Sequence, residues 1–287
     1  AVTLVLIDQP VTPEVRRKLA LAAETGAELV YGRSVLGAAL QSARVLARSA
    51  LRRERPLLIP PGGSSALGDL GFVSAALELA EQVREGALPE PAEIFVPVGT
   101  AGTQVGLVLG TRLAGMRSRV VGVLVTDILP PTPARMLRSA RASLRLLQRL
   151  DPAVPAIDLQ PGDFALVRDQ LGPGYGSATP AAEQAVAAAA ALGLRLETTY
   201  TGKCLAALRA RPPEGGPVLF WDTFDDVSAR WEAPVSPEHT PLPAPIRRAL
   251  AEPGERARVS RRGLQWAATQ ERSIGASPFR SHDRAER

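Results

Sequence analysis

Short apolar runs alternate with longer amphipathic segments along most of the chain. Apolar runs flanked by turn residues are typical of buried strands, and here they predict strands at residues 2–7, 28–31, 56–59, 94–98, 120–125 and 217–221. Apolar positions at helical spacing predict helices at residues 13–25, 36–53, 68–85, 104–115, 133–150, 180–192 and 204–211. Strands that alternate with helices indicate an α/β fold: a parallel sheet in a three-layer α/β/α arrangement.

Composition changes twice along the chain. A Pro/Gly cluster begins at residue 60, and residues 234–287 are rich in Pro, Arg and Glu. A segment of the second kind is typical of weakly ordered chain. We therefore expect two structured parts, residues 1–60 and 61–233, followed by a weakly ordered tail.

The distribution of charge argues against a nucleic-acid partner, and the length of the apolar runs argues against a membrane partner. Of the net charge of +5, residues 236–287 carry +4, and aromatic residues make up 4% of the chain. That is too few for base-stacking surfaces, and no run of residues approaches the length of a transmembrane helix. The arginines of residues 133–150 are then expected to form a solvated face. A single cysteine, Cys204, fits a reducing cytoplasm.

The position of the histidines limits the chemistry. His239 and His282 both lie in the expected tail, and the first 235 residues contain no histidine. This excludes a Ser-His-Asp or Cys-His nucleophilic site and a His-ligated zinc site from the structured parts. We expect no metal. Carboxylates, hydroxyls, lysine, tyrosine or a cofactor must supply the reactive groups.

One loop is a candidate phosphate site. The run of residues 94–98 is followed at once by the glycine–threonine loop, which consists of Gly99, Thr100, Ala101, Gly102 and Thr103, and then by a predicted helix. Small residues between a strand and a helix let main-chain N–H groups surround an anion. Other phosphates, or a simple chain turn, remain open for this loop taken alone.

Four segments in order resemble one family. They are residues 61–72 (Pro-Gly-Gly-Ser-Ser-Ala-Leu-Gly-Asp-Leu-Gly-Phe), the glycine–threonine loop, Gly174-Tyr175-Gly176, and Tyr200-Thr201-Gly202-Lys203. Together they resemble D-cysteine desulfhydrase and 1-aminocyclopropane-1-carboxylate deaminase, which are pyridoxal-phosphate (PLP) enzymes with the tryptophan synthase β-like fold. The resemblance covers residues 1 to about 222. It implies a homodimer that acts on a small amino acid.

The resemblance also implies roles for single residues. Residues 99–103 match the loop that holds the PLP phosphate, and Tyr175 and Tyr200 match two active-site tyrosines. Thr201 matches the partner of the pyridine nitrogen, where the deaminase has Glu and the desulfhydrase has Thr. A hydroxyl does not keep that nitrogen protonated, so the ring withdraws electrons less strongly. This favours β-elimination of a good leaving group, as in the desulfhydrase, over opening of a cyclopropane.

The sequence departs from the family pattern at two places. The family's Schiff-base lysine lies in a Gly-Gly-Asn-Lys-like motif that the sequence does not contain, and Lys18 and Lys203 are the two lysines present. We expect that residues 1–60 are a remnant of the small domain, that residues 61–233 form the large PLP-binding domain, and that the chain as given is inactive. After the last strand, Asp222, Thr223, Phe224 and Asp225 replace a glycine-rich turn.

Other interpretations stay open from the residues alone. Lys203 could replace the linking lysine, Cys204 could be a reactive thiol or a small packed residue, and both tyrosines could be packing residues. A relative without catalytic activity that keeps a phosphate pocket is the alternative function. A nucleotide-binding domain is a third hypothesis, which the absence of a Gly-x-Gly-x-x-Gly loop and of a Walker lysine disfavours.

Overall fold

The computed structural model describes residues 2–211, 215–224 and 242–251. A four-stranded parallel sheet forms the centre of its larger part, in the order β5-β4-β3-β6. The strands are β3 (Glu93–Val98), β4 (Arg119–Leu124), β5 (Ala165–Val167) and β6 (Val218–Phe220). The two central strands, β3 and β4, are apolar and buried almost throughout, which is typical of a parallel sheet covered on both faces.

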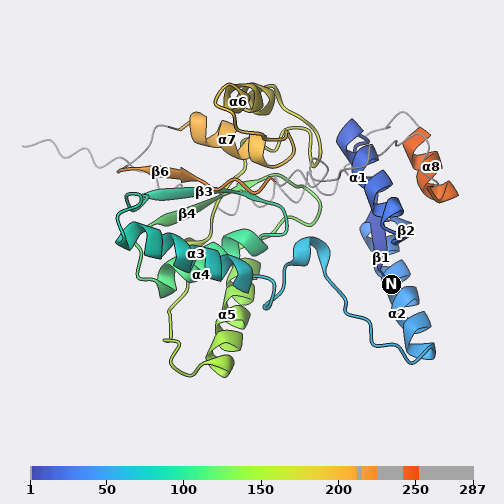
Figure 1. Cartoon of the computed structure of the whole chain (residues 1–287), viewed down its shortest axis with the longest axis horizontal. Coiled ribbons are helices and arrows are strands. Elements are labelled where there is room, and N and C mark those ends of the chain that lie inside the picture. Colours follow the sequence, from blue (N-terminus) through green and yellow to red (C-terminus); the bar gives the residue numbers. More distant parts are fainter. Residues whose placement is uncertain (1, 212–214, 225–241, 252–287) are drawn as a thin grey trace, which may run out of the picture.

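Helices cover both faces of this sheet (Figure 1). On one side lie α3 (Leu70–Arg84), α4 (Gly102–Leu113) and α5 (Pro133–Leu150), and on the other α6 (Pro180–Ala190) and α7 (Thr201–Arg209). Side chains alternate along β3: Ile94 and Val96 pack with α4, and Phe95 packs toward α7. The predicted three-layer α/β/α arrangement is therefore confirmed.

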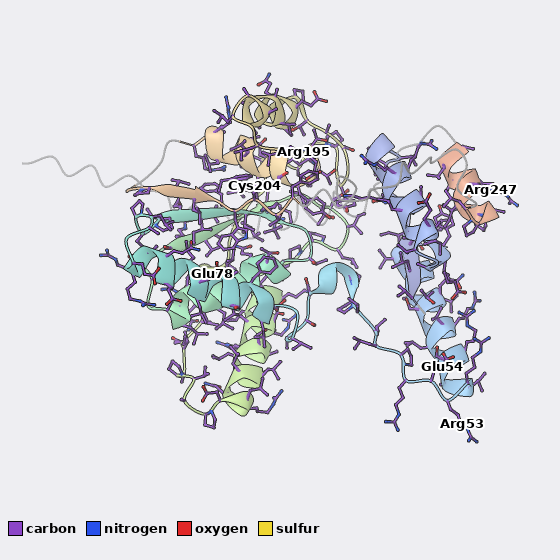
Figure 2. The ribbon with its side chains drawn as sticks, in the orientation of Figure 1. Arg53, Glu54, Glu78, Arg195, Cys204 and Arg247 are labelled. Atoms are coloured by element: carbon purple, nitrogen blue, oxygen red, sulfur yellow. The ribbon has the colours of Figure 1, made fainter. Side chains whose placement is uncertain are left out.

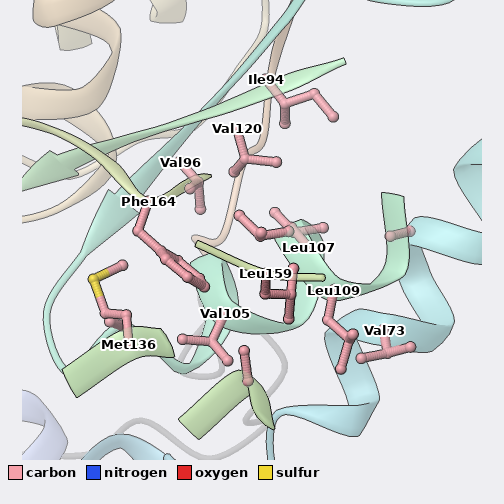
Figure 3. Close-up of a cluster of buried hydrophobic side chains, with 14 of the residues drawn as sticks. Val73, Ile94, Val96, Val105, Leu107, Leu109, Val120, Met136, Leu159 and Phe164 are labelled. Atoms are coloured by element: carbon pink, nitrogen blue, oxygen red, sulfur yellow. The ribbon is translucent and has the colours of Figure 1, made fainter. Parts of the chain in front are cut away.

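The core on the α4 side joins three helices to the sheet (Figure 3). Val105, Leu107, Met136 and Phe164 are each buried there. Glycine lets α4 approach α3 closely, because a Cβ atom at Gly110 would lie 2.6 Å from the Cβ atom of Ala76. This close packing fixes the position at which α4 begins.

A smaller part contains the N-terminal elements. Strands β1 (Thr3–Ile7) and β2 (Glu28–Arg33) pair in parallel, and α1 (Pro13–Glu24) and α2 (Val35–Leu51) follow them in the chain. Helix α8 (Ala244–Ala251) lies beside these elements (Figure 1). Its Ile246 packs in one cluster with Leu29 of β2, and Arg16 donates to the carbonyl of Leu250 (2.6 Å).

The structure corrects some details of the sequence prediction. The strand expected at residues 56–59 is wrong: no described strand pairs with this segment, and Leu57 is 85% exposed. Strand β5 and the short 3₁₀ turn η2 (Pro161–Asp163) lie between the helices predicted at residues 133–150 and 180–192, where the sequence predicted no element. Helix α8 lies inside the expected tail; residues 225–241 and 252–287, with both histidines, are outside the described residues. The domain boundaries stay a prediction.

Candidate functional site

The candidate site lies at the carboxyl edge of the four-stranded sheet. The strands are parallel, so the loops after β3, β4 and β6 leave the sheet at the same edge. Ligands of open α/β sheets bind in crevices at this edge. The glycine–threonine loop follows β3, and Asp127 lies three residues after the end of β4.

The glycine–threonine loop ends at the start of α4. Ala101 is the N-cap of this helix and has a left-handed conformation (φ 79°), which is uncommon for a residue with a side chain. Strain of this kind gathers at functional sites. The first N–H groups of α4, including those of Gly102 and Thr103, have no acceptor within the helix, and the helix dipole makes this end positive.

Residues 61–64 pack against the same loop. They include the 3₁₀ turn η1 (Pro61–Gly63). The hydroxyl of Ser64 accepts from the N–H of Gly102 (3.1 Å) and lies 2.6 Å from the hydroxyl of Thr100. Sequence reasoning assigned no role to Ser64, although the residue stands inside the quoted 61–72 segment. Two hydroxyls therefore lie at the start of α4, and one of them accepts from its first N–H group.

The loop has no room for larger side chains. A Cβ atom at Gly102 would lie 2.6 Å from Oγ of Ser64 and 2.9 Å from Oδ1 of Asp69. A Cβ atom at Gly99 would lie 3.2 Å from Cε1 of Tyr200. The glycines thus let Ser64, Asp69 and Tyr200 approach the main chain of the loop closely. This arrangement fits a phosphate group, which small residues at a helix N-terminus bind.

A buried carboxyl group lies behind the loop. Asp69 has no exposed surface, and its Oδ2 accepts from the hydroxyl of Ser139 (2.7 Å). Burial raises the pKa of this carboxyl group, and the serine hydrogen bonds oppose the rise. Sequence reasoning did not single out Asp69. Its neighbours indicate that it fixes α3 and α5 beside the start of α4.

The structure brings the two predicted tyrosines together. The hydroxyls of Tyr175 and Tyr200 are 2.8 Å apart, and the rings meet edge to face with centroids 5.9 Å apart. Tyr200 also packs against Gly99, so the pair borders the glycine–threonine loop. Burial raises the pKa of the Tyr200 hydroxyl, and Tyr175 raises it further, so Tyr200 is protonated at neutral pH.

Two carboxylates hold the main chain that carries these tyrosines. Asp127 accepts from the N–H of Tyr175 (2.9 Å). Glu197 accepts from the N–H groups of Thr199 (2.6 Å), Tyr200 (2.7 Å) and Thr201 (3.0 Å), and so satisfies the start of α7. Sequence reasoning missed both. The signal for Asp127 was its position three residues after the end of a buried strand.

Thr201 is fully buried at the first position of α7. Its hydroxyl accepts from the N–H of Glu197 (3.1 Å) and lies 3.4 Å from both the main-chain carbonyl and Oε1 of Glu197. The last two contacts are long for a hydroxyl donor. The hydroxyl therefore donates weakly, and its partners among the described residues are atoms of Glu197.

Lys203 and Cys204 are both buried on α7. Nζ of Lys203 donates to the carbonyls of Leu171 (2.7 Å) and Gly174 (3.2 Å), and burial lowers its pKa while Asp127 and Glu197 raise it. Cys204 packs against the sheet (Figure 2). Burial at this position raises the pKa of its thiol. These contacts favour the packed role for Cys204 over a reactive thiol.

The part of the chain that the structure describes contains neither a candidate metal site nor a candidate membrane span. In this part of the chain, no group of three or more His, Cys, Asp or Glu residues is arranged to hold a metal ion. None of the helices that the structure describes is long and apolar enough to cross a membrane.

Comparison with known proteins gives consistent matches. The family model described as "Pyridoxal-phosphate dependent enzyme" matches residues 3–223. D-cysteine desulfhydrase of Klebsiella pneumoniae (strain 342) is 37% identical over 177 residues, which cover 59% of this chain and 50% of that protein. The chain therefore spans about half the length of this curated relative.

A solved structure supports the fold. The crystal structure of an ACC deaminase homologue matches with a TM-score of 0.60 at 23% identity, over 76% of this chain and 64% of that chain. At this identity the likeness shows the shared architecture and no more.

We predict that Gly102→Ala weakens the binding of inorganic phosphate, because the new Cβ atom would displace Ser64 or Asp69. Overpacking of this kind also lowers the free energy of unfolding by about 1–3 kcal/mol. Gly71→Ala in α3 is the matched control, because a Cβ atom there meets no atom within 4 Å. Isothermal titration and urea unfolding measure both effects, and equal behaviour of the two variants would contradict the assignment.

We predict that the protein loses stability as the pH rises above about 10, where an unfolded chain ionises its tyrosines. The folded protein resists ionisation of Tyr200, because burial raises its pKa. The free energy of unfolding therefore falls as the pH rises. Unfolding curves of the native chain and of Tyr200→Phe across this pH range test the prediction. The variant should show a shallower loss; an unchanged slope would show that Tyr200 ionises freely.

Proposed function

Because the chain belongs to the family of pyridoxal-phosphate dependent enzymes, we propose that its glycine–threonine loop holds the phosphate of this cofactor. The family uses pyridoxal 5'-phosphate, and the chain has the tryptophan synthase β-like fold of these enzymes. The observation that carries the proposal is the start of α4, where the N–H group of Gly102 and the hydroxyls of Ser64 and Thr100 meet beside Tyr200. Gly99, Thr100, Ala101, Gly102 and Thr103 would hold the phosphate.

We propose β-elimination from a small amino acid as the reaction of this site, as in D-cysteine desulfhydrase. When bound, PLP withdraws electrons from the α-carbon of an amino acid and so weakens the bonds at that carbon. The similarity to the Klebsiella pneumoniae enzyme supports this choice. Thr201 supports it too, because a hydroxyl beside the ring nitrogen suits elimination of a good leaving group. Deamination of the ACC deaminase type is the second candidate reaction.

Tyr175 and Tyr200 are the proposed catalytic residues. Their hydroxyls share one hydrogen bond, and Tyr200 borders the phosphate loop. Either hydroxyl can be the donor in this bond, and burial raises the pKa of Tyr200. The pair would orient the substrate carboxylate or carry a proton.

The alternative is a relative that keeps the phosphate pocket and carries out no elimination. Neither lysine of the sequence fits the role of the cofactor-linking residue. Lys18 lies on α1, and Nζ of Lys203 is bonded to two main-chain carbonyls. We propose that the chain as given binds the cofactor through its phosphate without a covalent bond. We also propose that the chain forms a homodimer and is located in the cytoplasm.

We predict that the purified chain binds PLP and that inorganic phosphate competes with it, whereas pyridoxal, which lacks the phosphate, binds weakly. Thr100→Ala should raise the Kd for PLP by about tenfold, since a hydrogen bond to a charged group contributes about 1.5–3 kcal/mol. Thr25→Ala, a substitution on α1's carboxyl end, is the matched control. Quenching of tryptophan fluorescence measures the affinity. Equal binding of pyridoxal and PLP would overturn the phosphate assignment.

Borohydride reduction separates the two functional candidates. After incubation with PLP and reduction, peptide mapping should find Lys203 unmodified. A cofactor attached to Lys203 would make this residue the linking lysine and would remove the support for the alternative.

A further inference from the structure

Lys203 is a buried lysine to which the proposed function assigns no role. Its exposed fraction is 0%, although lysine is among the residue types that are least often buried. An ammonium group that is removed from water must be hydrogen-bonded to be tolerated. Two of its three N–H groups bond to the carbonyls of Leu171 and Gly174. Those carbonyls therefore account for the position of the side chain.

The two carbonyls belong to the loop of residues 171–176, which carries Tyr175. Three glycines in this loop have positive φ: Gly172 (63°), Gly174 (137°) and Gly176 (73°). Glycine loses more conformational freedom on folding than any other residue. A loop of this composition needs contacts from outside to hold a single shape. Lys203 provides two of them, one of which is at the residue before Tyr175.

The charges around Lys203 connect both tyrosines. Asp127, after β4, and Glu197, before α7, both interact favourably with its ammonium group. Asp127 also accepts from the N–H of Tyr175, and Glu197 accepts from the N–H of Tyr200. Lys203 and these two carboxylates thus act on the same two tyrosine segments.

We propose that Lys203 is a positioning residue: by fastening the 171–176 loop to α7, it sets the Tyr175 hydroxyl against that of Tyr200. The structure gives the geometry of the tyrosine pair, and the catalytic role of the pair rests on the proposed function. Without the ammonium group, two carbonyls would lose their donor, and the loop could move away from α7. Tyr175 would then lose its hydrogen bond to Tyr200 while the sheet and its helices stay folded.

The three tyrosines of the chain allow a direct test by ¹⁹F NMR of 3-fluorotyrosine-labelled protein. Lys203→Met keeps the apolar stem and removes the donors. It should shift the resonances of Tyr175 and Tyr200 in the folded protein. The resonance of Tyr31 should stay unchanged, because this residue lies among the N-terminal elements, where it donates to Asp8. Lys18→Met, at the only other lysine, should leave all three resonances unchanged.

A different result is expected if Lys203 only stabilises the fold and does not position Tyr175. Lys203→Met would then lower the free energy of unfolding, while Tyr175 and Tyr200 of the folded protein kept their native resonances. That outcome would overturn the proposal. PLP binding by the native chain is read separately, so a failure of the proposed function would leave the tyrosine result interpretable.

Reductive methylation tests the proposal on the native chain and does not require Lys203→Met to fold. Lys18 should react, while Lys203, whose ammonium group donates to the carbonyls of Leu171 and Gly174, should stay protected. Lys18 serves as the internal standard. Ready methylation of Lys203 in the native chain would contradict a fastened loop.

Discussion

The parallel pairing of β3 with β4 and β6 is the constraint on which the site depends. Val98 at the end of β3 lies in register with Leu124 at the end of β4, so the loops after both strands leave the sheet at one level. One loop starts α4 at Gly102, and the other carries Asp127 to the segment of Tyr175. A shift of register would separate the phosphate loop from the tyrosines.

Buried charge and glycine then complete the arrangement in complementary ways. Glycine at positions 99 and 102 lets Tyr200 and Ser64 approach the main chain of the phosphate loop. Asp127, Glu197 and Lys203 hold the main chain of the tyrosine segments by hydrogen bonds. The phosphate side of the site is therefore formed by small residues and the N–H groups at the start of α4, and the opposite side by charged groups that bind main-chain atoms.

The sequence predicted the layered α/β arrangement because buried parallel strands and amphipathic helices leave a clear periodic signal. It also pointed to the glycine–threonine loop, Tyr175 and Tyr200, which the structure brings together. The strand expected at residues 56–59 was wrong, because an apolar run does not reveal whether a pairing partner exists. Ser64, Asp127 and Lys203 act through main-chain contacts between distant segments, and such contacts leave no periodic pattern in a sequence. Glu197 acts locally, on N–H groups two to four residues further along the chain.

A crystal structure of the chain with inorganic phosphate or PLP tests the central claim most directly. The account predicts phosphate oxygens within hydrogen-bond distance of the N–H groups of Gly102 and Thr103 and of the hydroxyls of Ser64 or Thr100. The ring of PLP should then lie on the side of Tyr175 and Tyr200. Phosphate bound at the exposed arginines of α5, with none at the start of α4, would contradict the account.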